Sequence, residues 1–209
     1  MIKDMENHIS QVILDFYKGY PGSFLDVGSG HPVVGNITHP LEKSGWSGLC
    51  VEPRTNHNDE YKSLRPNSVV ENYAVVGSDY YDEYIKAYVN QDYSLYNVTG
   101  LNVTNTEDFI FWPVTTLGSL LKKYQIRTID LFNLNVMGYE KEVLQGVDFN
   151  FTKFGMILIN LHTWEKACND FSFLKDHGYL YLTMLSDQHE LWVNDVLPII
   201  KRQPPRSNL

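Results

Sequence analysis

Short apolar segments alternate with segments of helical periodicity along most of the chain. Met5, Ile9, Ile13 and Phe16 lie on one face of a helix, which Gly19 and the proline that follows it end. Further helices are predicted at 117–124, 140–144 and 171–174. Strands are predicted for 24–27, 48–53, 68–76, 109–114, 129–135, 156–161, 179–185 and 190–193.

Strands that alternate with helices are typical of an α/β fold with a mostly parallel sheet and helices on both of its faces. The last two strands are separated by only Ser186, Asp187 and Gln188, so they form a C-terminal antiparallel hairpin. We expect a single domain over residues 1–200 and a flexible tail at 201–209.

The pattern changes between residues 79 and 108. A helical stripe formed by Tyr81, Tyr84, Ile85, Tyr88 and Val89 precedes an Asn-, Thr- and Tyr-rich stretch without a period. We interpret 79–108 as an insertion or lid. Tyrosine offers a sugar both a flat ring and a hydroxyl, so the lid is the candidate acceptor site, although half of its tyrosines are expected to pack the helix onto the sheet. These tyrosines are Tyr80, Tyr81, Tyr84, Tyr88, Tyr93 and Tyr96.

Composition excludes several classes of protein. A hydrophobic content of 43% argues against disorder, and a net charge of -8 argues against non-specific nucleic-acid binding. No apolar run approaches the ~18 residues of a membrane span, and the first residues lack a signal pattern. Cys50 and Cys168 have no partner at disulfide-scaffold or zinc-site spacing. We expect a soluble, cytoplasmic protein.

Polar residues at the ends of the predicted strands indicate an adenosine site, because ligands of open α/β sheets bind at the carboxyl ends of the strands. Asp26 lies in a strand that runs into Gly28, Ser29 and Gly30, whose backbone can approach a ligand closely. Glu52 follows Gly28 by 24 residues, close to the spacing of an acid that binds ribose hydroxyls. We expect Pro53 and Arg54 to form the floor beside Glu52, and Tyr73, Ala74 and Val75 to line the adenine.

Two residues discriminate between adenosine cofactors. Val33 stands where a dinucleotide site needs its third glycine, so the helix packs poorly under a diphosphate. Asp26 would repel a diphosphate, but it favours the sulfonium and ammonium groups of S-adenosylmethionine. A nucleotide-binding oxidoreductase is therefore the less favoured alternative.

The motifs resemble the FkbM family of S-adenosylmethionine-dependent methyltransferases over about residues 22–194. The resemblance rests on FLDVGSG at 24–30, LEKSGWSGLCVEP at 41–53, IDLFNLNVMGYE at 129–140 and VLQG at 143–146. It implies a Rossmann-like class I methyltransferase fold with a seven-stranded sheet, and O-methyl transfer to a sugar or natural-product hydroxyl. The family usually has carboxylates where this chain has Asn135 and Met137, so we expect no metal site. Asn135 can still hydrogen-bond the cofactor or acceptor.

A sugar hydroxyl is a weak nucleophile, so a general base near it adds a factor of roughly 10²–10⁴ to the rate. His162, after the fifth strand of the site, is the first candidate, with a structural histidine as the alternative. Glu140 is the second candidate, with a first-turn helix acid as the alternative. His31 and His39 flank the glycine turn and are further candidates, and Trp164 beside His162 is either an acceptor contact or a packing residue.

The sequence thus predicts an O-methyltransferase that transfers a methyl group from S-adenosylmethionine to a carbohydrate, such as a deoxysugar of a glycan. The protein is expected to be compact and to act as a module of a larger glycan-synthesis polypeptide. A non-catalytic module that binds S-adenosylmethionine is the other alternative, because two of the family's carboxylates are missing.

Overall fold

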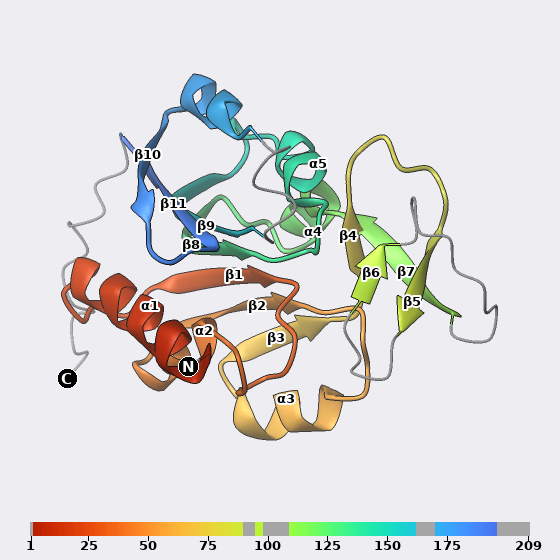
Figure 1. Ribbon diagram of the computed structural model, residues 1–209, viewed down its shortest axis with the longest axis horizontal. Helices are drawn as coiled ribbons and strands as arrows, with labels where there is room; N and C mark the ends of the chain where they lie inside the picture. Colours follow the sequence, from red (N-terminus) through yellow and green to blue (C-terminus); the bar gives the residue numbers. More distant parts are fainter. Residues whose placement is uncertain (1, 90–94, 98–108, 162–169, 196–209) are drawn as a thin grey trace.

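The computed structural model describes residues 2–89, 95–97, 109–161 and 170–195 (Figure 1). The helices are α1 (Ile2–Phe16), α2 (Thr38–Lys43), α3 (Asn58–Leu64), α4 (Leu117–Lys123), α5 (Glu140–Gln145) and the 3₁₀ helix η1 (Ser172–His177). The strands are β1 (Ser23–Val27), β2 (Ser47–Val51), β3 (Ser68–Glu71), β4 (Ala74–Val76), β5 (Tyr84–Val89), β6 (Leu95–Asn97), β7 (Phe109–Thr116), β8 (Thr128–Leu134), β9 (Lys153–Asn160), β10 (Tyr179–Met184) and β11 (His189–Asn194).

A seven-stranded sheet with the order β10-β11-β9-β8-β1-β2-β3 forms the centre of the protein. Five of its strands are parallel, and β10 and β11 form an antiparallel hairpin whose second strand pairs with β9. The predicted α/β fold with a C-terminal hairpin is therefore confirmed. The strand order reverses direction at β1, so the ends of β1 and β8 open at the point where ligands bind in such sheets.

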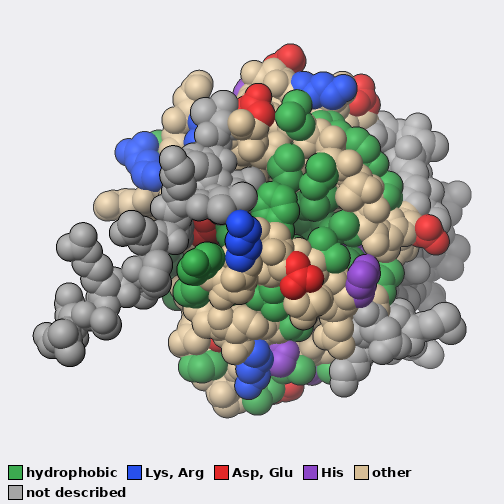
Figure 2. Space-filling model, turned by 90° about the vertical axis from the view of Figure 1, so that its left-hand side faces the viewer, with side chains coloured by type: hydrophobic (Ala, Val, Ile, Leu, Met, Phe, Trp, Pro, Cys, Tyr) green, Lys and Arg blue, Asp and Glu red, His purple; other side chains and the backbone are tan. Residues whose placement is uncertain are grey.

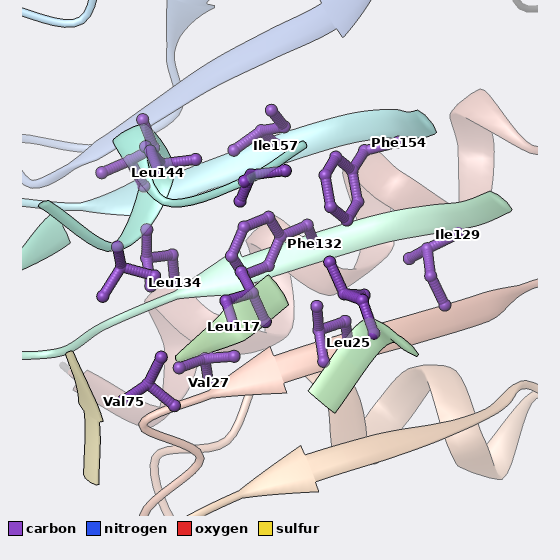
Figure 3. Packing of buried hydrophobic residues seen from close by; sticks show 14 of the residues in the cluster. Leu25, Val27, Val75, Leu117, Ile129, Phe132, Leu134, Leu144, Phe154 and Ile157 are labelled. Atoms are coloured by element: carbon purple, nitrogen blue, oxygen red, sulfur yellow. The ribbon is translucent and has the colours of Figure 1, made fainter. Parts of the chain in front are cut away.

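Helices cover both faces of this sheet, as predicted (Figure 1). On one face, α1, α2 and α3 pack against β1, β2 and β9 through Ile9, Leu41 and Tyr61. On the other face, α4, α5 and η1 pack over β1 and β8, and Figure 3 shows Leu117 of α4 beside Phe132 and Leu144 of α5 near Leu134. Alternate residues of β1 thus enter two separate cores, which places the side chain of Asp26 on the α1 side.

A second, four-stranded sheet with the order β4-β7-β5-β6 lies beside the carboxyl ends of β1, β2 and β3 (Figure 1). The prediction of a helix from the stripe at 81–89 was wrong, because residues 84–89 form β5, of which residues 84–88 pair with β7. Tyr, Ile and Val favour strands, and pairing with β7 overrides a period read over only nine residues. The strand predicted at 68–76 is also interrupted: its first part belongs to the large sheet and its second part, β4, to the small one.

The side of the molecule that carries the edge strand β10 shows a gathering of hydrophobic side chains, and Leu180, Tyr181 and Leu182 of β10 are about half exposed (Figure 2). Within the described residues, no helix has the length and hydropathy that crossing a membrane requires.

Candidate functional site

The glycine turn after β1 is held against the turn after β8 by backbone contacts. Gly28 and Gly30 have φ angles of 77° and 63°, which favour glycine. A Cβ atom on Gly28 would lie 1.7 Å from the carbonyl oxygen of Asn135, so no side chain fits there. The amide of Gly28 donates to the carbonyl of Val51, and the amide of Asn135 donates to that of Val27, both at 2.9 Å. Two strand ends therefore meet with nothing but backbone between them.

A cavity of about 280 Å³ opens on one side of this contact. Its wall brings together most of the residues predicted to bind the cofactor: Gly28, Gly30, Glu52, Pro53, Arg54, Tyr73, Ala74 and Asn135. The small sheet contributes further residues to the wall, and the rest come from the ends of β1 and β8. They are Val75, Val76, Ile85, Lys86, Ala87 and Trp112, and Val27, Val136, Met137 and Tyr139. The lining is mostly apolar, and its charged and amide side chains are those of Glu52, Arg54, Lys86 and Asn135. We call this cavity the apolar pocket.

Glu52 is held in place on the wall of the apolar pocket. Its side chain is 3% exposed, accepts a hydrogen bond from the amide of Gly30 at 2.8 Å, and pairs with the Nε of Arg54 at 2.6 Å. These contacts orient the carboxylate and tie the glycine turn to the segment after β2. A fixed carboxylate on an apolar wall suits the recognition of a ribose diol.

A second, polar pocket opens on the other side of the Gly28–Asn135 contact. Asp26, Ser29, Asn133 and Asn160 line it, together with Met5 and Glu6 of α1 and with Asn36, Gln188 and His189. The side-chain carbonyl oxygens of Asn133 and Asn160 are buried and accept no hydrogen bond. A buried acceptor without a donor costs about 1–3 kcal/mol, so this pocket suits a ligand with N–H groups.

The polar pocket also lies beside a buried cluster of charged residues. Asp26 is fully buried and accepts hydrogen bonds from Thr38 at 2.6 Å and from Asn133 at 2.8 Å. Behind it, the buried Arg65 pairs with Glu42 and donates to Thr38. When both carboxylates are ionised, they outnumber the single guanidinium and leave a net negative charge. Burial raises the pKa of Asp26, and hydrogen bonds and the Arg65 charge oppose that rise.

The turn after β8 carries backbone strain at the wall of the apolar pocket. Met137 has a φ of 56° and Gly138 one of 108°, and the two residues follow directly on Asn135 and Val136. Glu140 begins α5 and is fully buried, and its carboxylate accepts from the amides of Val136 at 2.7 Å and Gly138 at 2.9 Å. Non-glycine residues in this region of φ cost roughly 1–3 kcal/mol, so Glu140 stabilises a turn that would otherwise relax.

The other predicted residues fall into two groups. His162, Trp164, Tyr93 and most of the predicted lid lie outside the described residues. His31 and His39 are described, and neither is among the residues that line the two pockets in the described part of the chain.

His31 belongs instead to a cluster with His57 and Glu60, whose ligand atoms lie within 4.8 Å of one another. The Nδ1 atom of His31 accepts hydrogen bonds from the amides of Val33 and Val34, both at 3.0 Å. The proton of a neutral His31 therefore sits on Nε2, which faces Glu60 at 3.2 Å. A metal-binding histidine uses a nitrogen that carries no proton, so the cluster fits a hydrogen-bonded link better than a metal site.

His189 and the first turn of α1 are parts of the polar pocket that sequence reasoning missed. His189 is buried, pairs with Asn160 across the sheet and bonds Ser186 through Nδ1 at 2.7 Å. The sequence pattern points to residues that follow strands, whereas β11 runs antiparallel to β9 and presents its first residue at the same edge. No signal in the sequence places Met5 and Glu6 at this edge, since α1 precedes β1 by several residues.

Comparison with known proteins agrees with this architecture. Residues 26–181, three quarters of the chain, match the model of the methyltransferase FkbM domain. A comparison with curated proteins gives no match. The matched segment begins at Asp26 and contains the glycine turn, Glu52, the turn after β8 and the small sheet. The chain belongs to the FkbM family of methyltransferases.

Proposed function

We propose that this methyltransferase uses S-adenosylmethionine as its methyl donor. One observation supports the proposal most directly: two pockets of opposite chemistry meet at the Gly28–Asn135 contact. One pocket is apolar with an oriented carboxylate, and the other has two unpaired carbonyl oxygens beside a negative charge. S-adenosylmethionine has the same division, with an adenosine at one end and an ammonium and a sulfonium at the other.

The residues fit this cofactor as follows. Glu52 would bind the ribose hydroxyls, Tyr73 and Ala74 would contact the adenine, and Pro53 and Arg54 would support Glu52. Asn133 and Asn160 would accept hydrogen bonds from the ammonium, and Asp26 would provide the compensating charge. Gly28 and Asn135 line both pockets, so they would contact the middle of the cofactor, with Ser29 in the polar pocket and Gly30 in the apolar pocket on either side of them.

When bound, S-adenosylmethionine supplies a methyl group on a sulfonium, which is a good leaving group. The protein therefore needs to hold an acceptor oxygen in line with that methyl group and to exclude water, so positioning is its main contribution. We propose a hydroxyl of a carbohydrate as the acceptor and His162 as the base that removes its proton. Glu140 acts as a positioning residue, because both of its carboxylate oxygens accept backbone amides.

Calorimetry with two ligands tests the cofactor assignment. Wild-type protein should bind S-adenosylmethionine and also methylthioadenosine, which lacks the amino-acid end. Asn160→Ala should weaken binding of the first by about 10–100-fold, the value of one hydrogen bond to a charged group, and leave the second unchanged. Asn150→Ala, at an exposed asparagine, is the matched control. Binding of NAD without any response to S-adenosylmethionine would overturn the assignment.

Transfer of a labelled methyl group separates the enzyme from a binding module. Incubation with labelled S-adenosylmethionine and a panel of glycans should label one class of sugar. His162→Ala should reduce turnover by roughly 10²–10⁴-fold with unchanged cofactor affinity. Cofactor binding with no labelled acceptor would favour the binding module, and an unchanged rate in the variant would remove His162 as the base.

A further inference from the structure

The small sheet has two faces with different side chains. In β5, Ile85 and Ala87 point to one side and Tyr84 and Lys86 to the other, because side chains alternate along a strand. Register extends this division to β7: Trp112 lies opposite Ile85, and Phe111 lies opposite Lys86. Ile85, Ala87 and Trp112 line the apolar pocket. Lys86 lines it as well, whereas Tyr84 and Phe111 do not, so the face that carries these two rings points away from the cofactor.

This outer face carries an open groove. Its walls are formed by Tyr80, Tyr84 and Phe111, with Asp82, Glu83 and Lys86 around them. Phe111 is 62% exposed and Tyr84 is 55% exposed, so both rings present more than half of their surface to solvent. Exposed aromatic residues that gather on one face mark a binding surface more often than an accident of packing.

The groove is held in a fixed shape. The hydroxyl of Tyr80 donates to the backbone carbonyl of Tyr84 at 3.0 Å, which fixes the segment before β5 against the strand. The Nζ atom of Lys86 lies 3.6 Å from the centre of the Phe109 ring, and this cation–π contact holds the Lys86 side chain against β7. The rings of Tyr84 and Phe111 therefore stand on a paired β5–β7 platform, which orders them before a ligand binds.

The charges of the groove select the kind of ligand. Asp82 and Glu83 outnumber Lys86, so a phosphate backbone or an anionic sugar would be repelled. Carboxylates accept hydrogen bonds from hydroxyl groups, and aromatic rings stack on the C–H faces of sugar rings. Rings flanked by carboxylates thus match a neutral sugar.

We propose that the outer face of the small sheet, formed by Tyr84, Phe111 and the acidic residues beside them, binds a sugar ring of the acceptor at a distance from the hydroxyl that is methylated. This proposal rests on the proposed carbohydrate acceptor. It adds a second contact site, on the opposite side of the strands that wall the cofactor pocket. The site recognises an oligosaccharide rather than a single sugar.

An array of short neutral oligosaccharides of glucose, mannose, galactose and N-acetylglucosamine tests the proposal, followed by calorimetric titration of the sugar that is retained best. Tyr84→Ala and Phe111→Ala should each weaken its binding at least tenfold. Tyr81→Ala is the matched control, because Tyr81 is 93% exposed but does not line the groove. All three variants should bind S-adenosylmethionine like the wild type.

Three outcomes would overturn the proposal: retention of no sugar by the wild type, equal retention by Tyr84→Ala and Tyr81→Ala, or retention of an oligothymidylate in place of sugars. Loss of S-adenosylmethionine binding in Phe111→Ala would contradict the separation of the two faces. Failure of the cofactor assignment is distinguishable, since it would appear as wild-type protein that retains sugar but does not bind S-adenosylmethionine.

Discussion

Replacement of Gly28 by alanine tests the backbone contact on which both pockets depend. The new Cβ atom would lie 1.7 Å from the carbonyl oxygen of Asn135, about half of an ordinary contact distance. The turn after β1 and the turn after β8 would have to separate. Two hydrogen bonds of 2.9 Å, from Gly28 to Val51 and from Asn135 to Val27, hold them in their present positions.

Two costs add in this variant. A non-glycine residue at a φ of 77° costs about 1–2 kcal/mol. Overpacking at a site that cannot relax freely costs about 1–3 kcal/mol more. We therefore expect Gly28→Ala to lose about 2–5 kcal/mol of the free energy of unfolding, a large part of the ~5–15 kcal/mol of a typical domain. Cofactor affinity should also fall, because the displaced residues line both pockets.

Urea denaturation followed by circular dichroism measures the loss. Gly19→Ala is the matched control: its φ is 72°, but no atom lies within 4 Å of the added methyl group. It should lose only the conformational cost of about 1–2 kcal/mol and bind the cofactor normally. Equal destabilisation of the two variants, with full cofactor binding by Gly28→Ala, would refute the steric argument.

Three further predictions concern buried charges. Arg65→Met leaves Glu42 buried without its partner and should cost about 3–5 kcal/mol in urea denaturation, whereas Lys62→Met, at an exposed pair, should change little. Burial raises the pKa of Asp26 in the free protein, and a bound cation would lower it. S-adenosylmethionine should therefore bind more tightly as pH rises through that pKa, and Asp26 should lose its proton when the cofactor binds. Calorimetry in buffers of different ionisation enthalpy detects the release, and equal release by Asp26→Asn would contradict this assignment. Glu140→Gln removes an acceptor from the turn after β8 and should cost about 1–3 kcal/mol and weaken cofactor binding, and an unchanged unfolding midpoint would show that the carboxylate does not hold the turn.

The raised pKa of Asp26 also affects the stability of the fold. The unfolded chain loses this proton near the ordinary pKa of 3.8, whereas the folded chain retains it to higher pH. The contribution of Asp26 to the free energy of unfolding therefore decreases as pH rises from 3.8 through the raised pKa. A cationic ligand in the polar pocket would offset this loss.

Sequence reasoning located the large sheet because its strands are short apolar runs that end in glycine or polar residues, as at Val27 and Gly28. It also predicted much of the wall of the apolar pocket, because parallel strands end at one edge of the sheet and the residues that follow them lie together there. It did not find the small sheet, because strand pairing between β5 and β7 depends on contacts between residues far apart in the chain. The sequence also does not reveal the positioning role of Glu140, because that role depends on hydrogen bonds from two backbone amides that no residue spacing predicts.

The reversed direction of β11 has a consequence for how new specificities can arise in this fold. Crossover helices connect the parallel strands, so a change in those connections disturbs a whole layer of the core. The turn between β10 and β11 is short, and Gln188 and His189 at its end line the polar pocket. Insertions in this hairpin can therefore reshape the pocket while the helices stay in place, which makes residues 185–188 a part of the site that is open to variation.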